Sequence, residues 1–140
     1  MRRFFLVCLL AVHVVFASAN GGQTPAGSTP HTRAASAGGM FHVSYRADAK
    51  AARIGQFQRW TIEISDVGGR PIQDAQVRVD GGMPAHGHGL PTIPQVTPAD
   101  QPGLYLLEGL KFTMPGHWVV DLHIEAGGRT DTVRFELDLP

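Results

Sequence analysis

Hydrophobic and polar residues alternate along much of the chain after residue 40, and short polar or glycine-rich segments separate the alternating runs. The runs fall at residues 41–45, 58–64, 76–80, 103–112, 116–125 and 129–138. A period of two is typical of strands with one buried face, and none of the runs shows a sustained helical period. The pattern predicts six strands, or seven if Gly109 divides the run at 103–112.

Short strands at this spacing predict an all-β fold, and an immunoglobulin-like antiparallel β-sandwich of six to seven strands fits them best. The last two runs flank Gly127-Gly128, a strong turn signal, so we expect residues 116–125 and 129–138 to form a hairpin. The Cys-Trp-Cys pattern of antibody domains is absent, so the prediction concerns the architecture alone. A small β-barrel is the alternative.

The first 39 residues follow a different pattern. Two arginines precede an apolar run over residues 4–16, and Ala17-Ser18-Ala19 then matches a small-residue cleavage site. This order predicts a secretory signal peptide over residues 1–19. A short membrane anchor is the alternative, although the run is shorter than the about 20 residues that span a bilayer.

Residues 20–39 are rich in Gly, Ser, Thr, Ala and Pro and predict a flexible linker. We therefore expect a signal peptide at 1–19, a linker at 20–39 and one folded domain at 40–140. The protein would be periplasmic or secreted, with no integral membrane segment after cleavage.

Composition narrows the classes of function. The 12 Lys and Arg balance the 12 Asp and Glu, which argues against a nucleic-acid partner because such proteins carry a basic patch. The single cysteine, Cys8, lies in the predicted signal peptide, so the mature protein would have neither a disulfide nor a thiolate ligand. No Gly-x-Ser-x-Gly, phosphate loop or His-Glu-x-x-His motif is present, and we predict that the protein is not an enzyme.

Two segments repeat the motif Met-Pro-x-His. Residues 81–91 read GGMPAHGHGLP and do not fit a strand, and residues 112–118 read FTMPGHW. Each segment lies next to a predicted strand, so both can reach the same end of a sandwich, where loops cluster. Thioether favours Cu(I) and imidazole suits copper, zinc and nickel. The candidate metal ligands are therefore Met83, His86, His88, Met114 and His117, with copper as the candidate metal.

A structural interpretation of the same residues stays open. The two methionines can fill the ends of the core, and the two loop histidines can bind backbone carbonyls. Of the remaining histidines, His42 lies on the first predicted strand. His123 alternates outward with Asp121 and Glu125, so we expect both histidines to be surface residues.

Taken together, residues 83–89 (MPAHGHG), 102–105 (PGLY), 112–118 (FTMPGHW) and 131–135 (DTVRF) resemble the YtkA-like domain family, which is related to FixH-type proteins. The resemblance covers residues 40–140. It implies a small exported or membrane-tethered β-sandwich with a periplasmic accessory role, since some relatives accompany copper handling, oxidase assembly and metal efflux. The chain departs from the anchored FixH type because its apolar run looks cleavable.

Two hypotheses follow for the function. In the first, the chain is an exported module that binds or delivers copper to a periplasmic copper-handling or membrane protein. In the second, it is a metal-free structural or protein-interaction domain. Because a metal binds only neutral imidazole, the first hypothesis predicts that copper binding weakens in acid.

Overall fold

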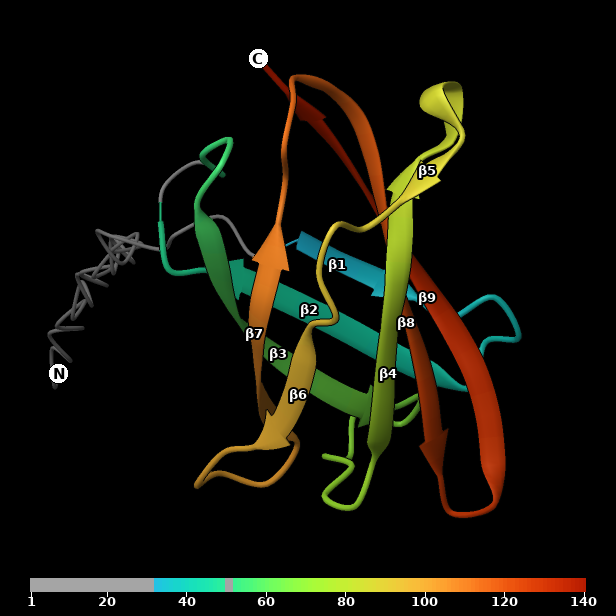
Figure 1. Cartoon of the computed structure of the whole chain (residues 1–140). Helices are drawn as coiled ribbons and strands as arrows, with labels where there is room; N and C mark the ends of the chain where they lie inside the picture. The colour runs from blue at the N-terminus through green and yellow to red at the C-terminus, as the bar shows by residue number, and fades with distance from the viewer. Residues whose placement is uncertain (1–31, 50–51) are drawn as a thin grey trace, which may run out of the picture.

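A computed structural model describes residues 32–49 and 52–140 as two antiparallel sheets packed face to face (Figure 1). One sheet has the strand order β1-β2-β3-β7-β6 and the other β5-β4-β8-β9. Strands β2-β3-β7-β6 and β4-β8-β9 reproduce the ABED and CFG sheets of an immunoglobulin-like sandwich. The predicted fold class is therefore confirmed.

The strands of the first sheet are β1 (Thr32–Ala35), β2 (Phe41–Ala47), β3 (Phe57–Asp66), β6 (Gln95–Pro98) and β7 (Leu104–Lys111). Those of the second are β4 (Gln76–Met83), β5 (His88–Gly89), β8 (Gly116–Ala126) and β9 (Arg129–Leu139), and a 3-10 turn, η1 (Pro84–His86), joins β4 to β5.

The six alternating runs correspond to β2, β3, β4, β7, β8 and β9. The run at 103–112 is one strand, because Gly109 is accommodated as a bulge: Gln58 pairs with Leu110 and Arg59 with Glu108. Gly109 has φ +85°, a conformation that favours glycine. The three strands that the alternation did not predict, β1, β5 and β6, have only two to four residues each, too few to establish a period.

The core lies between the inward faces of the two sheets. Trp118, Val120, Leu122 and Ile124 of β8 are completely buried, as their shared face in the sequence predicts. Aromatic rings from both sheets meet in this core. Tyr45 of β2 and Trp60 of β3 stack with ring centroids 4.0 Å apart, and the ring of Phe135 of β9 meets Tyr45 edge-on at 4.7 Å. These rings join the two sheets into one core.

The predicted hairpin at the end of the chain is confirmed. Strands β8 and β9 pair from Gly116↔Leu139 to Ala126↔Arg129. Gly127 and Gly128 form the two-residue turn with φ +56° and +71°, which a type I′ turn requires.

The folded domain begins earlier than residue 40. Strand β1 lies within the predicted linker at 20–39 and pairs with β2 from Thr32↔Tyr45 to Ala35↔His42. Asp131 on β9 fixes the following turn, because its carboxylate accepts hydrogen bonds from the backbone N–H groups of Gly38 (2.9 Å) and Met40 (3.2 Å). These contacts come from a residue more than 90 positions away, which the composition of the linker could not indicate. The predicted signal peptide lies outside the described residues.

Candidate functional site

The segment at 81–91 is less irregular than the sequence suggested. Strand β4 continues through Gly81 and Gly82 to Met83, and β5 then pairs back onto it, with Gly82↔Gly89 and Met83↔His88. Gly81 and Gly82 have φ of +141° and +149°, so the strand bends where only glycine fits easily. The expectation that this segment contains no strand was wrong, because the glycines kink the ladder without ending it.

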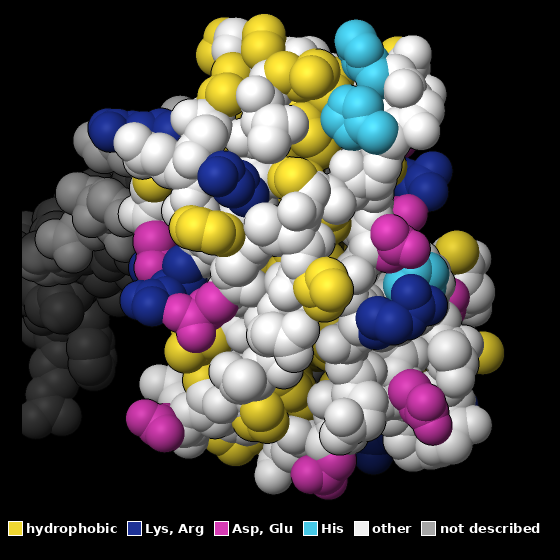
Figure 2. All heavy atoms as spheres, in the orientation of Figure 1, with side chains coloured by type: hydrophobic (Ala, Val, Ile, Leu, Met, Phe, Trp, Pro, Cys, Tyr) yellow, Lys and Arg dark blue, Asp and Glu magenta, His cyan; other side chains and the backbone are white. Residues whose placement is uncertain are grey.

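The hairpin between β4 and β5 presents His86 and His88 to solvent. Both residues are exposed, and their ring centroids lie 5.9 Å apart. Gly87 separates them with φ +67° and closes η1 by donating its N–H to the carbonyl of Pro84. The Nδ1 atom of His88 lies 3.2 Å from the carbonyl oxygen of Gly89, which leaves Nε2 available. Figure 2 shows histidine side chains at the end of the sandwich that carries η1, beside hydrophobic side chains.

Met83 lies beneath this hairpin. It is the cross-strand partner of His88, so the two side chains project from the same face of the sheet. Met83 is only 1% exposed, and a Cβ added to Gly116 would lie 2.8 Å from its Cε atom. The thioether therefore joins the first Met-Pro-x-His segment to the second.

The second segment reaches the same end of the sandwich through Trp118. The indole Nε1 donates a hydrogen bond to the carbonyl of Met114 at 3.0 Å, and the Met114 side chain is partly buried against the core. The indole ring meets His88 edge-on at 5.7 Å and Phe112 at 5.2 Å. Trp118 therefore contacts both segments, because its ring meets His88 and its indole N–H binds the Met114 carbonyl. The alternation along residues 116–125 indicates only that Trp118 faces the core.

His117 does not join this group. It precedes the inward-facing Trp118, so its side chain lies on the outer face of the sheet. Its Nδ1 is 2.9 Å from a carboxylate oxygen of Asp138, and its Nε2 is 3.9 Å from one of Glu136. The alternation of β8 already contained this signal, because neighbours in a strand point to opposite faces.

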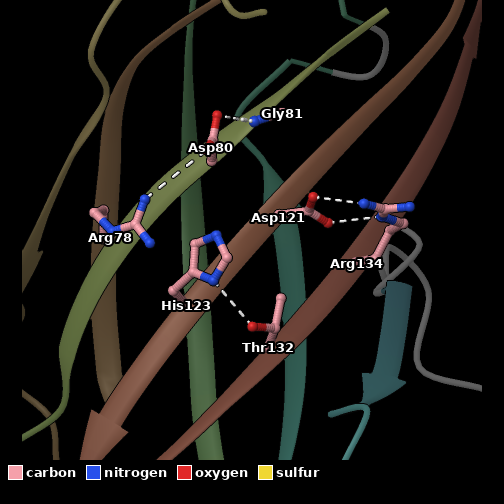
Figure 3. Close-up of polar contacts among 7 residues, drawn as sticks. All are labelled: Arg78, Asp80, Gly81, Asp121, His123, Thr132 and Arg134. Carbon is pink, nitrogen blue, oxygen red and sulfur yellow. Dashed lines mark hydrogen bonds and ion pairs between the residues drawn. The ribbon is translucent and has the colours of Figure 1, made fainter. Parts of the chain in front are cut away.

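The outer face of the same sheet is polar (Figure 3). His123 contacts the Thr132 hydroxyl at 2.9 Å, and Arg134 binds the carboxylate of Asp121 through two bonds of 2.8 and 2.7 Å. The outward direction predicted for His123 and Asp121 is confirmed. His42 lies on the outer face of the other sheet and is partly exposed.

The geometry defines what the end of the sandwich can do chemically. In the described residues, no three His, Cys, Asp or Glu side chains are grouped to hold a metal ion. A site there would instead combine the two imidazoles of His86 and His88 with soft thioether sulfur, and both kinds of donor suit copper. Two imidazoles bound to one ion at about 2.0–2.1 Å have ring centres about 6 Å apart or less, which the observed spacing of 5.9 Å satisfies.

One comparison with known proteins shows the family, and another shows the fold. A model of the YtkA-like family matches residues 33–123. A DUF4426 family protein from Pseudomonas aeruginosa PAO1 superposes with a TM-score of 0.54 at 17% identity, over 79% of this chain and 96% of that chain, and shares the fold. The C-terminal domain of ZirS superposes with a TM-score of 0.40 at 11% identity, over 97% of this chain and 84% of that chain. No curated protein matches the chain. No helix in the described part of the chain has the length and hydropathy to cross a membrane.

Proposed function

The chain belongs to the YtkA-like family, and on that basis we propose that it is an exported accessory domain that binds copper and delivers it to a partner protein. The partner is a periplasmic copper-handling or membrane protein. His86 and His88 are the imidazole ligands, and Met83 and Met114 supply thioether sulfur. His117 is left out of the ligand set, because it pairs with Asp138 on the opposite face of the sheet. The domain binds and transfers its cargo without catalysing a reaction.

The observation that carries this proposal is the meeting of the two Met-Pro-x-His segments at one end of the sandwich. Met83 opposes His88 across β4 and β5, and it also touches Gly116 of the second segment. The two exposed rings stand at a distance that one metal ion can bridge. The exposure of His86 and His88 at the tip of the sandwich also suits the transfer of an ion between proteins, because a partner can reach the two imidazoles directly.

Copper titrations test the proposal. We expect the purified protein to bind Cu(I) or Cu(II), and the double change His86→Ala, His88→Ala to weaken binding by more than about a hundredfold, since even outer-shell changes cost about 10–100-fold. Copper bound at His88 should also quench the fluorescence of Trp118, whose ring lies 5.7 Å away. Measurement in a Trp60→Phe background leaves Trp118 as the only indole.

His123→Ala is the matched control, because it removes an imidazole from the outer face of the same sheet. It should leave copper affinity unchanged. If the double variant binds copper as tightly as the unaltered protein, the proposed site is wrong.

The burial of Met83 and the contact of His88 with Trp118 also favour a second function, a metal-free interaction domain whose hairpin caps the core. In that case His88→Ala lowers the free energy of unfolding in metal-free buffer, and copper adds no stability. A copper-dependent gain in stability that is lost in His88→Ala supports the first function, because a ligand of the native state stabilises it.

A further inference from the structure

We infer that the outer edge of β9 is a self-association surface, on which a second copy of this chain pairs its own β9 in antiparallel orientation. The four edge strands of the sandwich differ greatly in length. Strands β1 and β6 have 4 residues each and β5 has 2, whereas β9 has 11. A long edge strand exposes a row of backbone donors and acceptors that can pair with another strand.

Within the described residues, the turn between β1 and β2 covers only the beginning of this edge. The N–H of Ala37 donates to the carbonyl of Thr132 at 2.8 Å, and Asp131 holds the same turn. Figure 1 shows the turn between β1 and β2 beside β9. In residues 32–49 and 52–140, no other backbone hydrogen bond reaches the edge of β9 beyond Thr132. As far as residues 32–49 and 52–140 are concerned, the part from Val133 to Leu139 is therefore open to pairing.

The hairpin geometry fixes which backbone groups point outward. Ala126 and Arg129 flank a two-residue turn and form a hydrogen-bonded pair, so the odd-numbered residues of β9 bond to β8. The even-numbered residues direct their N–H and C=O groups to the free edge, as the bond from Ala37 to Thr132 illustrates. Beyond the covered Thr132, Arg134 and Glu136 thus carry the backbone groups that a second strand would bond.

The side chains of Arg134 and Glu136 select one register. When two β9 strands pair antiparallel about Phe135, Arg134 of each copy lies directly opposite Glu136 of the other. A shift of two residues in one direction places Glu136 opposite Glu136, beside two pairs of Arg134 with Asp138, and a shift in the other direction places Arg134 opposite Arg134, so that only the register about Phe135 has no like-charged pair. Because opposite charges stabilise a directly facing pair and like charges destabilise it, the symmetric register about Phe135 is favoured. This register also keeps the hydrophobic residues of both copies on the core face.

The position of Arg134 fits this role. Its Nε and one terminal nitrogen bind Asp121, which holds the guanidinium in place on the outer face. Figure 3 shows the other terminal nitrogen directed away from Asp121. That nitrogen can donate to the carboxylate of Glu136 in the second copy. Two-fold pairing would join the two four-stranded sheets into one continuous sheet. Two-fold symmetry is the closed arrangement that most homodimers adopt.

This inference is independent of the proposed function. In the order β5-β4-β8-β9, the hairpin with His86 and His88 lies at one edge of the sheet and the pairing surface at the other. A dimer would therefore present two separate copies of the candidate copper site.

Sedimentation of the purified protein across an approximately hundredfold dilution series should show a monomer–dimer equilibrium, because association follows mass action. Glu136→Arg should abolish the dimer by facing Arg134 with a second positive charge. Glu136→Pro should also abolish it, since it removes an outward N–H and leaves the bonds to β8 intact. Glu125→Arg, the same charge change on an exposed residue of β8, is the matched control and should dimerise normally.

Hydrogen exchange of the unaltered protein gives a test that needs no variant. The amides of Arg134 and Glu136 should become protected as the concentration rises and should exchange on dilution. A protein that is monomeric at all concentrations overturns the inference. So does protection that does not depend on concentration, which would mean that the chain's own N-terminal residues cover the edge. A dimer that survives both changes at Glu136 would use another surface.

Discussion

Gly82→Ala should disrupt the hairpin that positions His88, because no side chain fits at this place in the sheet. Gly82 pairs with Gly89, and a Cβ on Gly82 would overlap the carbonyl oxygen of His88 and lie 2.6 Å from the Cα of Gly89. The backbone of Gly82 also has φ +149°, which L-residues rarely adopt. The protein must therefore either retain a strained conformation or separate β5 from β4.

Both routes cost stability. A non-glycine residue in this region of conformational space costs about 1–3 kcal/mol, and a lost ladder hydrogen bond adds about 0.5–1.5 kcal/mol. We expect the free energy of unfolding to fall by about 2–4 kcal/mol. Urea denaturation in metal-free buffer, followed by tryptophan fluorescence, measures the loss. A copper titration of the variant should also show weaker binding, because His88 moves away from Met83 and Trp118.

Gly89→Ala is the matched control on the opposite strand of the same pair. A Cβ at Gly89 meets only the carbonyl oxygen of Gly81, at 3.4 Å, so this variant should stay within about 0.5 kcal/mol of the unaltered protein. If Gly82→Ala is as stable as Gly89→Ala and binds copper equally well, close pairing of β4 and β5 does not build the site.

Three further changes test the fold. Tyr105→Phe should cost about 1–3 kcal/mol in urea denaturation, because the buried hydroxyl donates to the carbonyl of Ile72 (2.7 Å) and accepts from the N–H of Ala75 (3.0 Å), and both partners would lose their bond. Asp131→Asn should destabilise the protein at neutral pH but not in strong acid. Hydrogen bonds from Ser36 and from the backbone of the following turn lower the pKa of Asp131 from 3.8 to about 2, so its contribution is complete above about pH 4 and is lost as the pH falls through about 2. Equal losses for Asp131→Asn in thermal melts at both pH values would contradict this reasoning. Met83→Ala should cost about 2–5 kcal/mol and Met83→Leu less than about 1.5 kcal/mol, since leucine refills the buried space. If Met83→Leu nevertheless loses copper affinity in a titration, the sulfur is a ligand, whereas unchanged affinity would limit Met83 to packing.

The sequence by itself determined the six long strands and the hairpin of β8 and β9. Alternation over five to ten residues is enough to indicate which face of a strand is buried, and Gly127-Gly128 favours the type I′ turn that closes a two-residue hairpin loop. The same alternation determined that His123 points outward, and it could also have separated His117 from His88.

The short edge strands and the candidate site were decided only by tertiary structure. β1 is held by Asp131 from the far end of the chain, and β5 exists because Gly82 and Gly89 let two backbones approach closely. The contact of Met83 with Gly116 and that of His88 with Trp118 both cross between segments about 30 residues apart. A local pattern indicates which face of a strand a side chain lies on. It cannot indicate which distant segment packs against that face, because the packing of the whole sandwich decides this contact.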